Sequence, residues 1–428
     1  MSVSKFKGAK FACYAAYFTM SSVFCFPALL FTLFHEKYGI SYTLLGTLVL
    51  TNFCTQLTVD LIFTFFSKKF NVKAVVRIMP LLTAAGLLIY ALIPTFFPNI
   101  AYLGLLIGTI IFSVAAGFSE VLLSPMIAAI PSKNPQRDMS MLHSLYAFGV
   151  FTVAIITTVY LKIFSAENWV YLGLFFAALP IIAAVLFMAS PLPDMDGTES
   201  AQGVAKSKER IIGTALCVAC IFFGSCAENV MSNWVSSYAE SALHIDKALG
   251  DLLGLAGFAI LLGLMRMVYA KFGKNISVVL LIGMIGAATC YLVAGLSLHA
   301  VPALIACMLT GLFTAMLWPG TLILMEEKIP SPGVAAYALM AAGGDLGAAM
   351  APQLMGAVVD TVAASNFAVE LGAKLGRTAE QIGMQAGMLV TSLFPILGVI
   401  VVLIIITYFK KHNLKNAQGL PPLKTENE

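Results

Sequence analysis

The chain has 428 residues, of which 60% are hydrophobic and only 11% are charged, and its mean hydropathy is +0.92. Apolar runs of about 20 residues recur from end to end, each long enough to cross ~30 Å of hydrocarbon as a helix, so no room remains for a soluble domain. The net charge is +4, and the basic residues lie between these runs, so the charge does not indicate nucleic-acid binding.

The sequence predicts an all-α membrane protein with twelve transmembrane helices in two pseudo-symmetric six-helix bundles. The alternating ten-residue segments of an outer-membrane barrel are absent from the sequence. We expect an N-terminal bundle in 1–190, a cytoplasmic linker in 191–210 that is polar and rich in turn formers, and a C-terminal bundle with a cytoplasmic tail in 211–428. The predicted spans are 11–34, 44–66, 74–96, 100–129, 139–163, 168–189, 211–238, 248–270, 276–297, 300–325, 335–360 and 385–409.

The positions of the 25 Lys and Arg residues predict the orientation. If both termini lie on one side of the membrane, the positive-inside rule places that side in the cytoplasm. We expect the protein to cross the cytoplasmic (inner) cell membrane of a bacterium many times. The opposite side receives only Lys37, Lys162, Lys247, Lys374 and Arg377.

Five carboxylates lie inside or at the ends of the apolar segments: Asp60, Glu120, Glu228, Asp345 and Asp360. A charge in the bilayer core costs at least about 2.5 kcal/mol, so such residues usually face an aqueous path for an ion or solute. Asp360 stands at the outer end of its span, where we expect a water-exposed helix end.

The second span carries Asn52, Gln56 and Asp60 at intervals of four, which places them on one helical face. We expect this face to point into the bundle, with Asp60 serving either proton coupling or the anchoring of the following loop. In the fourth span Glu120 shares a face with Ser113. A glutamate removed from water binds its proton more tightly, which suits proton coupling; the alternative is a hydrogen-bonded packing residue.

Spans seven, ten and eleven supply further candidates for binding a polar solute. Amides and aromatic rings together favour a ligand rich in hydroxyl groups, although Trp234 also suits an interfacial aromatic belt. Pro319 predicts a bend in span ten, and Pro352 frees a carbonyl in span eleven. The predicted solute-binding residues, including those of span two, are Asn52, Gln56, Glu228, Asn229, Asn233, Trp234, Trp318, Asp345 and Gln353.

Several stretches together resemble the fucose:proton symporter-like branch of the major facilitator superfamily, a sugar permease branch. They are MLWPGTLILMEEKIP with AAGGDLGAAMAPQLMGAVVD, EVLLSPMIAAIP, and AENVMSNWVSSYAE. The resemblance implies that Glu120 matches the branch's acidic residue of span four. The branch also has an acidic residue in span one, which this chain lacks. Either Asp60 takes that role, or coupling differs, or coupling is absent.

Two basic loops resemble the superfamily's cytoplasmic loop G-x-x-x-D-R-x-G-R-R. The first departs from that pattern at Ser67 and at Asn71, where we expect the left-handed turn that a glycine would supply. The resemblance implies a gating role for the loop lysines, which are Lys68, Lys69, Lys73, Lys271 and Lys274.

The sequence therefore predicts a monomeric secondary transporter for a small, sugar-like polar solute, with proton symport through Glu120 and Asp60. An exporter of drugs or metabolites and an uncoupled facilitator share the fold and stay as alternatives. No enzyme site, cofactor or metal is expected, because the five histidines are scattered and the eight cysteines lie in apolar segments.

Overall fold

The computed structural model describes residues 5–66, 70–132, 135–193, 208–329 and 333–412. Within these ranges every regular element is helical. The α-helices are α1 (Lys7–Leu29), α2 (Phe31–Tyr38), α3 (Tyr42–Phe66), α4 (Val72–Phe96), α5 (Ala101–Ala129), α6 (Pro135–Phe164), α7 (Trp169–Ala189), α8 (Lys208–Ser237), α9 (Lys247–Leu249), α10 (Gly257–Phe272), α11 (Ile276–Leu296), α12 (Ala300–Thr314), α13 (Leu317–Lys328), α14 (Gly333–Ala363), α15 (Asn366–Leu375), α16 (Ala379–Thr391) and α17 (Leu393–Lys411). Short 3₁₀ turns η2 (Pro98–Ile100) and η3 (Ala166–Asn168) and π-helical segments η4 (Tyr238–Ala242) and η5 (Gly250–Ala256) complete the set.

These helices make the twelve predicted passes, and the fold class is confirmed. In the described part of the chain, eleven segments are long and apolar enough to cross a membrane, and α6 supplies the remaining pass. Three of the passes are made of more than one α-helix: α9, η5 and α10 form one, α12 and α13 another, and α16 and α17 the third. Helical passes are required because hydrocarbon offers no partner for an unpaired peptide group.

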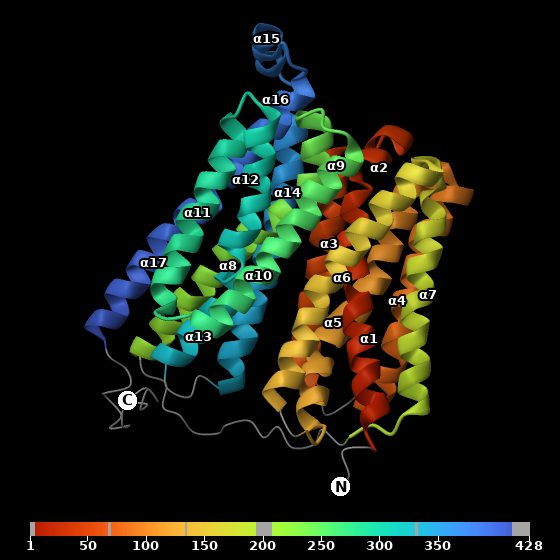
Figure 1. Ribbon diagram of the computed structural model, residues 1–428, viewed down its shortest axis with the longest axis vertical. Helices are drawn as coiled ribbons and strands as arrows, with labels where there is room; N and C mark the ends of the chain where they lie inside the picture. Colours follow the sequence, from red (N-terminus) through yellow and green to blue (C-terminus); the bar gives the residue numbers. More distant parts are fainter. Residues whose placement is uncertain (1–4, 67–69, 133–134, 194–207, 330–332, 413–428) are drawn as a thin grey trace.

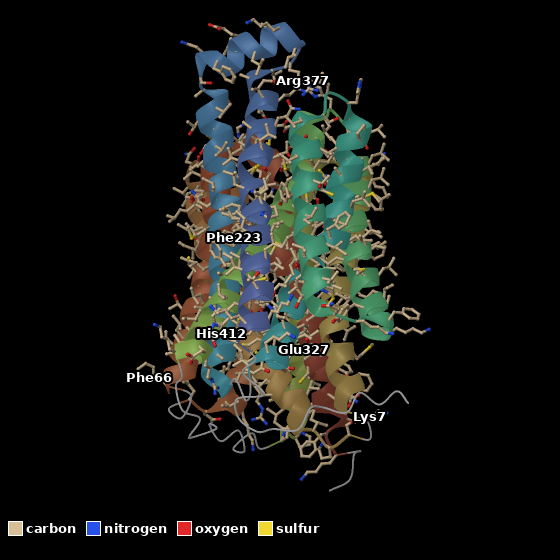
Figure 2. All side chains as sticks on the ribbon, turned by 90° about the vertical axis from the view of Figure 1, so that its left-hand side faces the viewer. Lys7, Phe66, Phe223, Glu327, Arg377 and His412 are labelled. Carbon is tan, nitrogen blue, oxygen red and sulfur yellow. The ribbon has the colours of Figure 1, made fainter. Side chains whose placement is uncertain are left out.

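The helices fall into two groups, which we call the N-half (α1 to α7) and the C-half (α8 to α17). Figure 1 shows the two halves together at the end that carries α15, the upper end, and diverging toward the end where α1 begins, the lower end. Figure 2 shows Arg377 at the upper end and Lys7, Phe66 and Glu327 at the lower end. Of the predicted linker, 194–207 lie outside the described residues.

The predicted bend in span ten is present, but it lies just before the proline. Helix α12 ends at Thr314 and α13 begins at Leu317. Because Pro319 has no N–H, the carbonyl four residues earlier, on Ala315, loses its helical donor. That carbonyl accepts a hydrogen bond from Arg266 Nε of α10 at 2.9 Å. The break thus turns a backbone acceptor toward a charged side chain.

Polar contacts join the two halves at the upper end. Asp360 of α14 is half-buried and accepts hydrogen bonds from the first two N–H groups of α3, on Tyr42 at 3.2 Å and Thr43 at 2.6 Å. A carboxylate at a helix N-terminus satisfies unpaired donors and complements the helix dipole. The expectation that Asp360 is a free helix end in water is therefore wrong. Tyr42 also donates to Glu380 at 2.5 Å.

Two glycines allow α3 and α14 to approach each other across the halves. A Cβ at Gly356 would lie 2.3 Å from the Tyr42 carbonyl oxygen, and one at Gly46 would lie 3.0 Å from Gln353 Cα. Real Cβ atoms essentially never approach as closely as the first of these distances. Gly356 therefore fixes the upper-end contact more strictly than Gly46 does.

We expect Gly356→Ala to open the upper end, because the added methyl group overpacks the contact at a cost of about 1–3 kcal/mol. Spin labels on the exposed residues Leu44 and Phe367, in a background without native cysteines, would report this as a larger population of long distances. Gly46→Ala should give a smaller change. Unchanged distance distributions in Gly356→Ala would show that α3 and α14 do not limit closure.

Candidate functional site

The predicted polar face of α3 exists and is bonded to α5. Asn52 and Gln56 are buried at 6% and 1% exposure. The Gln56 amide donates to Asn52 Oδ1 at 3.0 Å, and Ser113 Oγ of α5 donates to the same oxygen at 2.6 Å. A buried amide needs such partners to offset its lost hydration. This part of the polar face therefore joins α3 to α5 within the N-half and also offers polar groups to a solute.

Asp60, one turn further along α3, meets a carboxyl of the other half. Its side chain forms a hydrogen bond with the side chain of Asp345 on α14. Asp345 is only 3% exposed, and Asp60 is half-buried. A carboxylate can only accept, so a hydrogen bond between two carboxyl groups requires a proton on one of them. This contact between the halves can therefore form only while one of the two carboxyl groups is protonated.

Glu120 of α5 lies beside this pair. Its carboxyl is close enough to act electrostatically on both Asp60 and Asp345. Asp60 Oδ1 and Asp345 Oδ2 are buried and find no hydrogen-bond partner among the described residues. Three carboxyl groups from α3, α5 and α14 thus converge where the halves meet, and we call them the carboxyl cluster. Like charges this close cannot all be ionised without a large cost.

Glu228 has a partner that sequence reasoning missed. Arg266 of α10 places Nη2 3.5 Å from Glu228 Oε1 of α8, in addition to its bond to the Ala315 carbonyl. Glu228 Oε2 is buried and has no partner within the described residues. The orientation rule counts Arg266 among the loop charges, yet it lies inside α10, six residues before the helix ends at Phe272. An arginine within an apolar run was the available signal.

Aromatic side chains of the N-half face the same region. Tyr17 of α1 and Tyr146 of α6 meet edge to face with ring centroids 6.5 Å apart. Tyr17 interacts electrostatically with Glu120 and Arg266, and Tyr146 with Glu120 and Glu228. Charges of both halves therefore surround this tyrosine pair.

The amides of α8 are bonded mainly within their own helix. Asn229 donates to the Ser225 carbonyl at 3.1 Å, and Asn233 donates to the Asn229 carbonyl at 2.8 Å. Asn229 is half-buried and Asn233 is 8% exposed. Both amide groups keep their oxygen as an acceptor for a further donor.

Trp234 is fully buried, and its indole N–H donates to the Pro352 carbonyl at 3.1 Å. Its ring packs against Phe31 and Tyr42, with centroids 5.4 and 5.8 Å away. Neither a solute nor lipid reaches this ring in the present conformation. Stacking on a solute would require the upper end to separate.

Of the other two predicted residues of the C-half, Trp318 packs against α14 and Gln353 belongs to α14. Trp318 of α13 is half-buried and packs against Gly344, where an added Cβ would lie 2.2 Å from the indole. Gln353 is half-buried beside Gly46 of α3, and its Oε1 has no partner among the described groups. Gln353 is therefore the one that offers an unsatisfied acceptor where the halves meet.

Asp251 of η5 is a second buried charge that the sequence analysis did not single out. It is fully buried and accepts from Ser236 at 2.5 Å, from Lys247 at 3.1 Å and, across the halves, from Thr158 of α6 at 3.3 Å. The signal was the spacing of Lys247 and Asp251 by four residues, which pairs opposite charges on a helix. Together with Asp360, Asp251 ties the upper ends of the halves.

The predicted gating loops are described in part, because Lys68 and Lys69 lie outside the described residues. Lys73 is half-buried in the first turn of α4; Lys271 and Lys274 are exposed. The expected left-handed turn at Asn71 is wrong, because its φ is −78° and its side chain caps α4 by accepting from the Ala74 N–H at 3.1 Å. Asn275 adopts the left-handed conformation in the second loop, with φ of +46°.

A protein whose twelve helical passes form two halves around buried ionisable groups belongs to the class of membrane transporters. Residues 11–352 match the family model of the Major Facilitator Superfamily, and the chain belongs to this superfamily. No curated protein matches the sequence.

Solved structures show the same fold at low identity. A bacterial homologue of the human lysosomal transporter Spinster, in an inward-facing and occupied conformation, is similar with a TM-score of 0.71 and 12% identity over 96% of this chain and 99% of that chain. A D-xylose–proton symporter is similar with a TM-score of 0.69 and 16% identity over 91% of this chain and 97% of that chain. The transporter FucP in its outward conformation is similar with a TM-score of 0.58 and 14% identity over 94% of this chain and 99% of that chain. The family model confirms the superfamily, while the fucose:proton symporter-like branch is one of several similar groups.

Proposed function

We propose that this protein is a secondary active transporter that moves a small polar solute of the sugar class by alternating access with proton symport. The observation that carries the proposal is the hydrogen bond between Asp60 and Asp345, which joins the two halves and requires a proton on one of the two carboxyl groups. Separation of the halves at this level would expose both carboxyl groups to water and release that proton. Proton occupancy is thereby linked to conformation.

Glu120 is the group through which we expect solute and proton to be linked. It adjoins the Asp60 and Asp345 pair and also acts on Tyr17 and Tyr146, which stand beside Arg266 and Glu228. A change in the protonation of Glu120 therefore alters the electrostatic field both at the Asp60–Asp345 pair and at the two tyrosines. We therefore assign proton coupling to the whole carboxyl cluster, with Glu120 between the proton pair and the polar residues that would bind the solute.

The predicted orientation places the lower end in the cytoplasm, with both termini there, in a bacterial cell membrane. Polar contacts tie the upper ends of the two halves, and the helices diverge toward the lower end (Figure 1). In the proposed orientation this conformation faces inward. We propose a monomer as the functional unit, since each chain contains both halves.

The solute class follows from the donors and acceptors that remain. Gln353 Oε1 and Glu228 Oε2 lack partners among the described residues, and the amides of Asn229 and Asn233 keep acceptor capacity. Hydroxyl groups would satisfy such acceptors. The named solutes of two similar structures, D-xylose and fucose, are of this kind.

Uptake into proteoliposomes tests this function. A panel of hexoses, deoxyhexoses and nucleosides is offered with an inward proton gradient, and at least one should accumulate. Counterflow exchange without accumulation under any gradient would identify an uncoupled facilitator. Binding of lipophilic cations in preference to the whole panel would identify an exporter of drugs.

A further inference from the structure

Arg266 has more hydrogen-bonding capacity than the described residues use. Its guanidinium group carries five N–H donors. Nε donates to the Ala315 carbonyl at 2.9 Å, and Nη2 reaches Glu228 Oε1 at the long distance of 3.5 Å. One third of the side chain, 33%, remains exposed. A cation in a membrane-spanning helix normally has a full set of partners, so this arrangement indicates a site that a ligand completes.

The guanidinium group faces the space between the halves. Tyr17 on α1 of the N-half interacts electrostatically with Arg266, and Tyr146 on α6 interacts with its partner Glu228. Both tyrosines also interact with Glu120. These electrostatic interactions with residues of α1 and α6 place the pair on the side of the C-half that faces the N-half, where a solute would pass.

Glu228 supplies the complementary group. Its Oε2 is buried and has no hydrogen-bond partner among the described residues, although its Oε1 faces Arg266. A buried acceptor left without a donor costs about 1–3 kcal/mol. A ligand hydroxyl would satisfy it. The pair therefore offers donors for an oxyanion and, beside them, an acceptor for a hydroxyl group.

The charges around the pair favour a ligand with a single negative charge over a dianion. Arg266 is the cation, while Glu228 and Glu120 are acidic. A dianion such as a phosphate monoester would meet two carboxyl groups and only one guanidinium. A carboxylate matches the planar fork of the guanidinium and carries a single charge.

We propose that Arg266 and Glu228 form a subsite for a carboxylate and its neighbouring hydroxyl, and that the solute is a hydroxylated monocarboxylate of the sugar-acid type. This inference rests on the proposed function and narrows its solute class. The carboxylate accepts from Arg266 while a hydroxyl donates to Glu228 Oε2. If Glu120 takes up a proton as the anion binds, the net charge of the site stays the same.

Matched pairs of ligands test the subsite in the full-length purified protein. D-Glucuronate and D-galacturonate are compared with D-glucose and D-galactose by thermal unfolding and titration calorimetry. We expect tighter binding of the acids than of the parent sugars. Arg266→Gln should weaken the binding of the acids by about 10- to 100-fold, which is the loss expected for hydrogen bonds to a charged group. The affinity for the parent sugars should change only slightly.

Two further variants separate binding from folding. Arg266→Lys keeps the charge and should keep part of the preference for acids. Arg377→Gln alters an upper-end arginine that donates to the Leu298 carbonyl and should leave the preference unchanged. Equal binding of acids and parent sugars, or binding of neither, would overturn the subsite. Failure of the proposed function would look different, because acids would then bind without proton-driven uptake.

Discussion

Glu120→Gln is expected to abolish uphill accumulation of the solute while counterflow exchange continues. Glutamine fills the same volume and can hydrogen-bond, but it cannot bind and release a proton. One proton moved with each solute supports about a tenfold solute gradient for each unit of pH difference. In the variant the ratio of internal to external solute should fall to about one, whatever the gradient.

The measurement is solute uptake into proteoliposomes under an imposed pH difference, followed by counterflow in the same vesicles. Glu167→Gln is the matched control, because Glu167 lies in η3 at the upper end with 81% of its side chain exposed. Full accumulation in Glu120→Gln would remove Glu120 from the coupling mechanism. Loss of both accumulation and exchange would indicate a damaged site instead of uncoupling.

Asp345→Asn is expected to make solute exchange less dependent on pH. In the wild type the bond between Asp60 and Asp345 exists only while one carboxyl holds a proton, and two ionised carboxyls repel each other. Glu120 faces the same pair and strengthens that repulsion. In the variant the amide always supplies a donor to Asp60, so the halves stay joined at every pH. Exchange should therefore be slower than in the wild type at high pH.

Counterflow rates measured over a pH series check this, with Asp60→Asn as the reciprocal variant that should behave alike. Asp246→Asn is the control, since Asp246 is an upper-end carboxylate 3.6 Å from Lys162 and 56% exposed. A wild-type pH profile in both Asp345→Asn and Asp60→Asn would show that the pair does not control the movement of the halves.

The passes were predictable because the bilayer sets their length. The expected span 276–297 corresponds to α11, Ile276–Leu296, and the expected span 139–163 lies within α6, Pro135–Phe164. A hydrophobic run must match the hydrocarbon thickness whatever packs against it, so its ends are visible in one sequence. The same holds for the polar face of α3, where Asn52 and Gln56 share a side and are bonded to each other.

Contacts between distant helices were not predictable in this way. Periodicity shows that Asp60 faces inward, but it does not show that Asp345 of the other half lies opposite. Sequence reasoning used Arg266 only as an orientation signal, because a charge near the end of an apolar run can be either an orientation signal or a buried functional residue. Its partners, Glu228 and the Ala315 carbonyl, become adjacent only when α8, α10 and α12 pack together.

Proton movement during solute entry is the most direct measure of the coupling proposed here. Proteoliposomes with a trapped pH-sensitive dye and no initial pH difference receive solute from outside. The carboxyl cluster predicts internal acidification that follows solute entry and disappears in Glu120→Gln. Solute entry at the full wild-type rate without any proton entry would contradict the assignment of proton coupling to Asp60, Glu120 and Asp345.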